Sequence, residues 1–328
     1  MDGELPMETL LKVSNLSIGI RKGKNLLSSV ESITYNIKAG EILGIVGESG
    51  SGKTLTALSI PGLLGENKII TTGSILFKGK NLLSASEKEL ESIRGNQISM
   101  IFQEPFSSLN PLMKIGDQIA ETLKIHGEKD TGAIKLKVMD HMEKLGLPDP
   151  EKLAETYPHR LSGGMCQRVM IALAIICRPR LLIADEPTTA LDQKTQSQIT
   201  SLLKEINNDM GTSILFISHD LEVIKNLCDR VMVMYSGRIL EAGKTDEVFY
   251  HPAHEYTRGL LNSIPSRKKR GMDLTSIPGR IPSLEEGRPR GCPFHPRCVK
   301  AKPGCKEDFA PAKSLSATHT SHCILSED

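Results

Sequence analysis

The residues best suited to chemistry lie between positions 47 and 54, in the order Gly-Glu-Ser-Gly-Ser-Gly-Lys-Thr. This segment matches the phosphate-binding pattern G-x-x-x-x-G-K-[ST] at every fixed position. Glycines let the backbone curve around a phosphate, so that several N–H groups point at one anion. Lys53 is expected to neutralise phosphate charge and the Thr54 hydroxyl to hold Mg²⁺. The expected phosphate-binding set is Gly47, Ser49, Gly50, Ser51, Gly52, Lys53 and Thr54.

A second candidate pair, Asp185 and Glu186, follows the apolar run 181–184. A strand that ends beside the phosphate loop can present Asp185 to Mg²⁺, directly or through water. Glu186 could then polarise an attacking water as general base. A solvated acidic turn is the alternative.

Three further positions stand next to predicted elements. Ser162, Gly163 and Gly164 precede an apolar helix, where the serine is a good N-cap and the glycines free backbone N–H groups to face outward. This is either a plain helix start or a second anion-binding terminus. Gln103 and His219 each follow a predicted strand, where ordinary loop chemistry is the alternative.

The elements that position these residues can be read from apolar runs. A buried strand is predicted at 41–46, directly before the phosphate loop, and a helix begins at 54–60. Apolar residues at helical spacing predict a helical subdomain between 111 and 155. Strands alternating with helices imply an α/β fold with a mostly parallel sheet. The other predicted strands are 11–20, 29–37, 74–77, 98–102, 181–184, 213–218 and 230–235.

Composition limits the possible classes of protein. The 328 residues suffice for about two domains, and 39% hydrophobic content supports a globular core. The net charge of +2 gives no reason to expect nucleic acid as a partner. No run of about 18 apolar residues suggests a membrane span. The first residues lack the features of a signal peptide, so cytosol is the expected compartment.

Beyond about residue 252 the chain is rich in Pro, Gly and Arg, which predicts an irregular appendage. It holds Cys292, Cys298, Cys305 and Cys323, four of the seven cysteines. Four thiols in a segment without an obvious core suit a metal. Tetrahedral zinc, with substitution by a histidine, and four free thiols are both open readings. The candidate histidines are His295, His319 and His322, and Cys166, Cys177 and Cys228 are expected to be packing residues. The basic run 267–270 is expected to be a solvated linker.

Together, these motifs resemble the ATP-binding subunits of ABC transporters over residues 10–250. Residues 47–54 are similar to Walker A, Asp185 and Glu186 to Walker B with the catalytic carboxylate, and 161–164 to the signature. Gln103 is similar to the Q-loop, 190–192 to the D-loop and His219 to the switch histidine. The resemblance implies a P-loop NTPase (RecA-like) core, a small antiparallel β subdomain and an inserted helical subdomain at about 106–170. It implies an ATPase domain at 1–251 and a C-terminal region at 252–328.

The resemblance also implies how such a protein works. Two subunits would sandwich two ATP molecules, and Ser162, Gly163 and Gly164 of one would meet the γ-phosphate held by the other. Gln103 would contact Mg²⁺ and couple the site to the membrane partner, His219 would position the γ-phosphate, and Asp192 would belong to the nucleotide site. In one departure, Ile20 stands where the family usually stacks an aromatic ring on adenine, and Tyr35 has the wrong spacing to replace it.

The C-terminal segments 251–261, 277–279 and 292–298 resemble the oligopeptide/dipeptide importer subfamily. This implies ATP hydrolysis that powers uptake of short peptides at the cytoplasmic face of the cell membrane. The implied partners are a second, different ATPase subunit, two transmembrane permease subunits and an extracytoplasmic peptide-binding protein. It favours a [4Fe–4S] cluster on the four cysteines, with Zn²⁺ as the alternative.

Three other functions remain open at this point. Nickel and metal-opine importers share much of this ATPase. A soluble ABC-type ATPase acting on nucleic acid is disfavoured by the single phosphate loop and the near-neutral charge. A redox or metal sensor built around the four cysteines is the third.

Overall fold

The computed structural model describes residues 8–264 and 276–326, which form two compact units. The first unit contains Lys38–Glu41 and Ser84–Ile217. The second contains Thr9–Ile37, Ile42–Leu83 and the chain from Ser218 onward. The basic run 267–270 lies outside the described residues.

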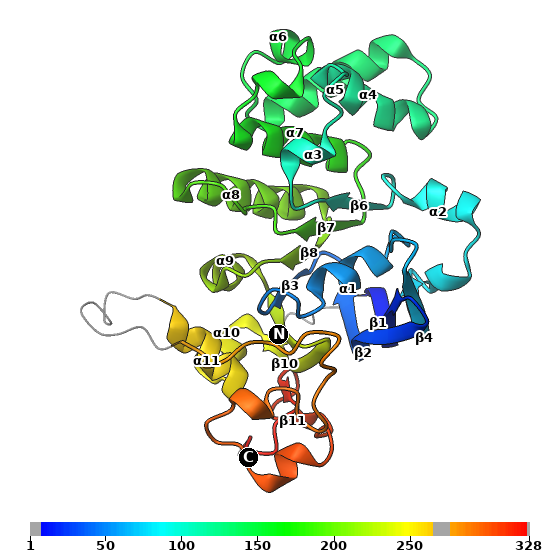
Figure 1. Cartoon of the computed structure of the whole chain (residues 1–328). Helices are drawn as coiled ribbons and strands as arrows, with labels where there is room; N and C mark the ends of the chain where they lie inside the picture. The colour runs from blue at the N-terminus through cyan, green and yellow to red at the C-terminus, as the bar shows by residue number, and fades with distance from the viewer. Residues whose placement is uncertain (1–7, 265–275, 327–328) are drawn as a thin grey trace, which may run out of the picture. The chain divides into compact units, whose positions relative to one another are not determined.

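A parallel sheet forms the base of the first unit (Figure 1). Its strands are β6 (Ile98–Ile101), β7 (Leu181–Asp185) and β8 (Ser213–Ile217), in the order β6-β7-β8. Every residue of β7 and β8 is buried, which explains why both strands read as continuous apolar runs. The carboxyl end of β7 places Asp185 and Glu186 at one edge of this sheet.

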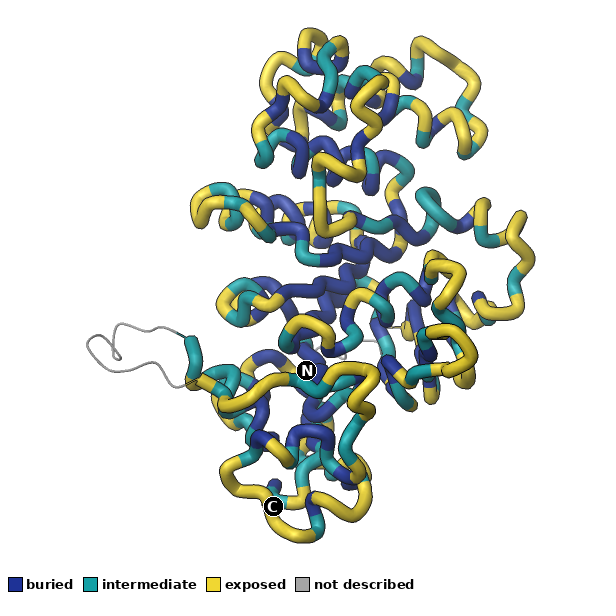
Figure 2. Tube along the Cα trace, viewed as in Figure 1, coloured by how far each residue is buried: buried dark blue, intermediate teal, exposed yellow. Residues whose placement is uncertain are grey.

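Helices make up the rest of the first unit. The apolar positions predicted between 111 and 155 are the buried ones, including Ile115, Ile119, Ile134 and Val138. Figure 2 shows buried and exposed stretches alternating along the chain. The segment contains three helices, as its apolar spacing predicts. The bounds are α2 (Glu87–Ile93), α3 (Pro105–Ser108), α4 (Ile115–Ile125), α5 (Thr131–Lys144), α6 (Pro150–Ala154), η2 (Pro158–Arg160), α7 (Gly163–Ile175) and α8 (Gln193–Met210).

The second unit begins with an antiparallel sheet of order β2-β1-β4-β5. In β1 and β4 the pairing runs from Leu11 opposite Phe77 to Ile20 opposite Lys68. The bounds are β1 (Thr9–Lys22), β2 (Asn25–Lys38), β4 (Lys68–Phe77) and β5 (Lys80–Asn81), with the turn η1 (Leu82–Ser84) after them.

A second set of strands in this unit has the order β3-β9-β10-β12-β11. β3 and β9 are parallel, whereas β10 pairs antiparallel with both β9 and β12. The strands are β3 (Ile42–Val46), β9 (Arg230–Tyr235), β10 (Arg238–Lys244), β11 (Lys313–Ser314) and β12 (Thr320–Ser321). The helices are α1 (Lys53–Ser59), α9 (Leu221–Leu227), α10 (Thr245–Tyr250) and α11 (Glu255–Ser263).

The C-terminal region is less irregular than its composition predicts. It contains α11, the short turns η4 (His295–Arg297) and η5 (Pro303–Lys306), and β12, which extends the sheet at β10. Tyr256 and Phe294 are 0% and 3% exposed, so the region has an aromatic core. Two-residue strands carry no readable periodicity, which is why the sequence gives no sign of them.

Candidate active site

The phosphate loop connects β3 to α1 in the second unit. Gly50 and Gly52 have φ of +80° and +100°, a region that favours glycine. At Gly47 a Cβ would lie 2.2 Å from the Met234 carbonyl oxygen on β9, so no larger residue fits there. The glycines of the motif are therefore required by this loop's own geometry.

The Lys53 side chain lies inside the loop. It is 5% exposed, and its Nζ donates to the carbonyl oxygens of Gly47 at 2.8 Å and Glu48 at 3.1 Å. Thr54 is exposed at the first turn of α1, and Ser49 is exposed in the loop. Ser51 is fully buried, and its Oγ has no hydrogen-bond partner among the described residues.

In the first unit, Glu186 follows β7 with φ of +49°. This conformation is uncommon for a residue with a side chain, and functional sites are among the places that retain it. Its Oε2 accepts hydrogen bonds from Thr189 Oγ1 at 2.9 Å and Gln103 Nε2 at 3.2 Å, and its backbone N–H donates to the Ile217 oxygen. Asp185, at the strand end, is 3% exposed. The structure thus joins Glu186 and Gln103, which are 83 positions apart.

The start of α7 lies against the start of α8, also in the first unit. Ser162 caps α7 by accepting from the Met165 N–H, and Asp192 caps α8 by accepting from Thr195. A Cβ on Gly164 would come within 2.8 Å of Thr195 Cγ2, whereas one on Gly163 would meet only Leu191 at 3.8 Å. Hydrogen bonds from Thr195 hold the pKa of Asp192 below its ordinary value.

Two other sequence predictions concern the second unit. His219 is exposed between β8 and α9. Tyr35 is 6% exposed within β2 and Ile20 is half-buried in β1. The buried Tyr35 ring is not available to stack on a base, in agreement with its wrong spacing in the sequence.

The four C-terminal cysteines line one small cavity, together with His295 and His322. No disulfide joins any of the described cysteines. Backbone N–H groups donate to two of the sulfurs, from Lys302 to Cys305 and from Leu325 to Cys323, each at 3.4 Å. Within residues 8–264 and 276–326, no group of three or more His, Cys, Asp or Glu is arranged to hold a metal ion.

The chemistry of the cavity favours protonated thiols when nothing is bound. Burial raises the pKa of Cys292 to about 11 and also raises that of Cys298. A metal would therefore have to displace protons from these thiols. Burial also raises the pKa of Cys166 to about 11, but this cysteine lies in α7, outside the cavity, with its Sγ 3.8 Å from the Pro158 oxygen.

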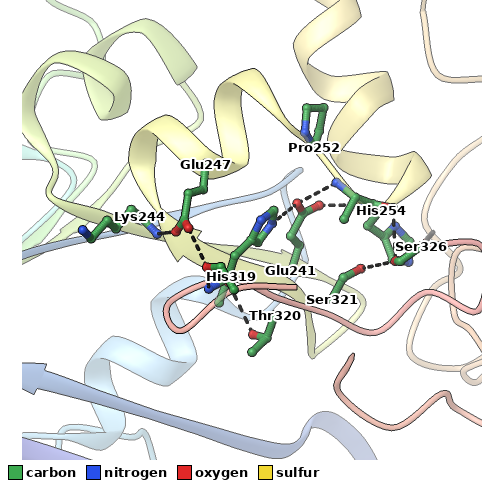
Figure 3. A network of polar contacts seen from close by, with 12 residues as sticks. Glu241, Lys244, Glu247, Pro252, His254, His319, Thr320, Ser321 and Ser326 are labelled. Carbon is green, nitrogen blue, oxygen red and sulfur yellow. Dashed lines mark hydrogen bonds and ion pairs between the residues drawn. The ribbon is translucent and has the colours of Figure 1, made fainter. Parts of the chain in front are cut away.

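His319 does not line this cavity, although it was a candidate ligand. Its Nε2 lies 2.7 Å from Glu241 Oε1, and both side chains are buried. The same carboxylate accepts the backbone N–H groups of Ala253 and His254 at 2.8 Å each (Figure 3). Glu241 thus joins β10, the start of α11 and the segment before β12.

Sequence reasoning missed three residues that the second unit brings to the phosphate loop or the cavity. Arg297 contacts both carboxylate oxygens of Glu48, and the Tyr256 hydroxyl accepts the Glu48 N–H. His254 lies with its Nε2 3.7 Å from Cys292 Sγ. No local pattern in the sequence pairs these positions.

Among the described residues, no helix combines the length and the apolar character needed to cross a membrane.

Two family models match the chain. Residues 30–189 match the ABC transporter family, and residues 240–305 match the oligopeptide/dipeptide transporter C-terminal region. The second match covers most of β10, all of α11 and three of the four cysteines of the cavity.

Curated relatives resemble the chain over nearly its whole length. It is 44% identical over 313 residues to the oligopeptide transport ATP-binding protein OppD of Salmonella typhimurium, covering 94% of this chain and 93% of the relative. It is 46% identical over 300 residues to OppD of Haemophilus influenzae, covering 92% of each. The dipeptide transport ATP-binding protein DppD of Bacillus subtilis is 43% identical over 322 residues, with 98% and 96% covered.

A solved structure agrees with these relatives. The dimeric ATP-binding cassette MJ0796, in a post-hydrolysis state bound to ADP and Pi, has a TM-score of 0.65 and 28% identity. The similarity covers 72% of this chain and 98% of the cassette. The chain therefore belongs to the ABC transporter ATP-binding proteins, in the oligopeptide/dipeptide transporter subfamily.

Proposed function

We propose that this protein is the ATP-hydrolysing subunit of an importer for di- and oligopeptides. The observation that carries the proposal is 44% identity to an oligopeptide transport ATP-binding protein over 94% of the chain. The identity includes the C-terminal region that distinguishes this subfamily. Nickel or metal-opine import is the second candidate, since such importers share the ATPase, but no relative described above carries that name.

In this proposal the phosphate loop binds the triphosphate of ATP. Lys53 is already held inside the loop by two carbonyl oxygens and would turn its ammonium to the β- and γ-phosphates. The Ser51 hydroxyl is buried without a hydrogen-bond partner among the described residues, and it is a polar group that a bound phosphate could satisfy. Thr54 and Asp185 provide a hydroxyl and a carboxylate, the oxygen ligands that Mg²⁺ prefers, and Gln103 would add an amide oxygen. When bound, Mg²⁺ would neutralise charge on the phosphates.

Glu186 is the proposed general base for the attacking water. Thr189 and Gln103 hold its carboxylate in place, and its left-handed backbone is the kind of strain that functional sites retain. His219 is proposed to position the γ-phosphate. Ser162, Gly163 and Gly164 would meet ATP on a second subunit, with Asp192 fixing the neighbouring start of α8.

The proposed assembly contains a second ATPase subunit with a different sequence, two permease subunits and an extracytoplasmic peptide-binding protein. The chain would work at the cytoplasmic face of the cell membrane. An ATPase domain at 1–251 and a C-terminal region at 252–328 complete the proposal.

We propose a [4Fe–4S] cluster as a further cofactor, held by Cys292, Cys298, Cys305 and Cys323. Four thiols around one cavity and backbone N–H groups aimed at two sulfurs support it. The four thiols would have to rearrange to hold it, since the described residues form no group that could bind a metal ion. Anaerobic purification should give a coloured protein that contains iron, and loss of iron in a Cys298→Ser variant would support these ligands. A colourless protein that contains zinc would show that the site binds zinc instead of iron. A protein that contains neither metal would show that the four thiols are free.

The first prediction tests the proposed chemistry. Glu186→Gln keeps the shape of the side chain but removes the base, so we expect ATP to bind while turnover at this chain's own ATP site falls by about 100-fold or more. Lys53→Ala should lose ATP binding itself. The measurements are equilibrium ATP binding and phosphate release by the complete transporter in lipid vesicles.

Turnover by Glu186→Gln equal to that of the unaltered protein would remove Glu186 from this role.

The substrate class is tested in the same vesicles. If the peptide-loaded extracytoplasmic binding protein stimulates ATP hydrolysis, the result supports peptide import. If nickel alone stimulates it, the result supports the second candidate.

A further inference from the structure

One residue of the phosphate loop, Glu48, is held on all three of its polar groups. Its carbonyl oxygen accepts from Lys53 Nζ at 3.1 Å. Its backbone N–H donates to the Tyr256 hydroxyl at 3.0 Å. Its two carboxylate oxygens accept from Arg297 Nη1 at 2.9 and 3.0 Å. Two of these three partners lie 208 and 249 positions away, in the C-terminal region.

Arg297 is built to stay in one place. Its side chain is 7% exposed, compared with 30% for that of Glu48. Its Nε donates to the Pro278 oxygen at 2.7 Å, and Nη1 also reaches the Tyr235 hydroxyl at 3.3 Å. Arginine presents its donors in a rigid planar fork, so fixing several of them fixes the whole group. The carboxylate of Glu48 therefore meets a rigid partner.

Tyr256 is equally constrained. It is fully buried. Its ring packs edge-on against Tyr235, with centroids 4.7 Å apart, and at a tilt against Phe294, with centroids 5.2 Å apart. Its hydroxyl is thus a fixed acceptor for the Glu48 N–H. Phe294 and Arg297 both belong to the segment between Cys292 and Cys298, so that short segment supports both contacts to the loop.

We propose that Arg297 and Tyr256 are positioning residues for ATP binding, which act through Glu48 on the phosphate loop and on Lys53. This inference rests on the proposed function, because it takes the loop to bind ATP. A loop that is already ordered loses less conformational entropy when the nucleotide binds. If Glu48 lost its contacts with Arg297 and Tyr256, its carbonyl oxygen would no longer be held in place for the Lys53 ammonium. Each ATP molecule that binds would then have to order the loop again. The C-terminal region is then part of the ATP-binding machinery.

The contacts predict a loss of ATP affinity rather than a loss of chemistry. Lys53 and the loop hold phosphate both before and during hydrolysis, so weaker positioning should raise KM and leave kcat nearly unchanged. For Arg297→Ala we expect ATP affinity to fall about tenfold, with kcat changing by less than about threefold. Tyr256→Phe removes only the acceptor for the Glu48 N–H and should have a smaller effect in the same direction.

The experiment measures ATP affinity by equilibrium binding in the full chain carrying Glu186→Gln, and KM and kcat in the complete transporter without that change. The variants are Arg297→Ala, Arg297→Lys, Glu48→Gln and the exchanged pair Glu48→Arg with Arg297→Glu. Arg290→Ala is the matched control, since Arg290 is an exposed arginine of the same region that contacts Glu307 and Asp308. Thermal unfolding of each variant is measured alongside.

The proposal expects weaker ATP binding for Arg297→Ala and Glu48→Gln, partial recovery with Arg297→Lys or the exchanged pair, and no change for Arg290→Ala. A purely structural role would lower the unfolding temperature with no change in KM, and that result overturns the proposal. Unchanged ATP affinity in Arg297→Ala and Glu48→Gln also overturns it. Failure of the unaltered protein to bind ATP, or normal binding by Lys53→Ala, would instead contradict the proposed function.

Discussion

At the scale of single residues, one buried carboxylate links β10 to the C-terminal region. Glu241 is fully buried and accepts from two backbone N–H groups and from His319 (Figure 3). A buried carboxylate is tolerated only when its acceptor sites are filled, and here three donors from two separate segments fill them. The hydrogen bonds of Glu241 therefore form only when the C-terminal segments are packed against β10.

His254, next to Glu241, is the group whose ionisation should matter most. Burial lowers its pKa to about 4, and it contacts Tyr256 N–H through Nδ1, which must then be unprotonated. Glu241, Glu255, Arg258 and His322 are the charged groups that act on it.

The second prediction is a pH dependence of stability. In the unfolded chain His254 binds a proton below about pH 6.5, whereas in the folded chain it binds one only below about pH 4. The folded state therefore loses stability as pH falls from about 6.5 towards 4, by roughly 2–3 kcal/mol. Denaturant unfolding at pH 7, 5.5 and 4 measures this fall. Asn is a good N-cap, so His254→Asn should keep the cap of α11 and flatten the curve.

The control for this prediction is His251→Asn, which changes an exposed histidine three residues earlier. It should leave the pH dependence unchanged, and the slope that remains in His254→Asn should come partly from His141 and His322, whose pKa values burial also lowers. An identical slope for His254→Asn and the unaltered protein would rule out His254 as its source.

At the scale of elements, the starts of α7 and α8 depend on each other. Thr195 Oγ1 donates to Asp192 Oδ2 at 2.7 Å, so the Thr195 side chain is fixed by the cap of its own helix. Gly164 lies directly against it. The cap of α8 therefore depends on a small residue at position 164 of α7.

The third prediction uses two neighbouring glycines. Gly164→Ala places a methyl group 2.8 Å from Thr195 Cγ2, which must shift and weaken the Asp192 cap, at a cost of about 1–2 kcal/mol. Gly163→Ala meets only Leu191 at 3.8 Å and should be neutral or slightly stabilising, since alanine favours helix. Urea unfolding compares the two. Equal stability would mean that the start of α7 is free to move away from α8.

At the scale of the whole molecule, the proposed mechanism divides each ATP site between two subunits. The fourth prediction is that the isolated chain binds ATP but hydrolyses it about tenfold or more slowly than the complete transporter. The missing group is the Ser162 segment of a partner, which only assembly supplies. Phosphate release per phosphate loop, measured before and after reconstitution with the partner subunits, tests this.

The control for the assembled transporter is Lys53→Ala in this chain alone, which should lower but not abolish turnover if the second ATPase subunit has its own phosphate loop. Full turnover by the isolated chain would contradict a shared site.

Much of the fold could be predicted because its signals are local. Predicted strands at 41–46, 181–184, 213–218 and 230–235 agree with β3, β7, β8 and β9 to within about one residue. Those strands are buried, so each is a continuous apolar run. The strands β10, β11 and β12 were missed, because β10 is half-buried and the other two are only two residues long.

The sequence by itself predicted which residues could hold a phosphate, since the glycines, Lys53 and Thr54 fall between positions 47 and 54 at the spacing of a phosphate-binding loop. It also indicated Glu186, Gln103 and the capped start of α7, although it could not show that Gln103 contacts Glu186. Only the tertiary structure decided that Glu48 is held by Tyr256 and Arg297, and that Glu241 rather than a metal engages His319. Contacts across about 80 to 250 positions leave no periodicity in the chain, because they depend on how separate segments pack and not on any local spacing.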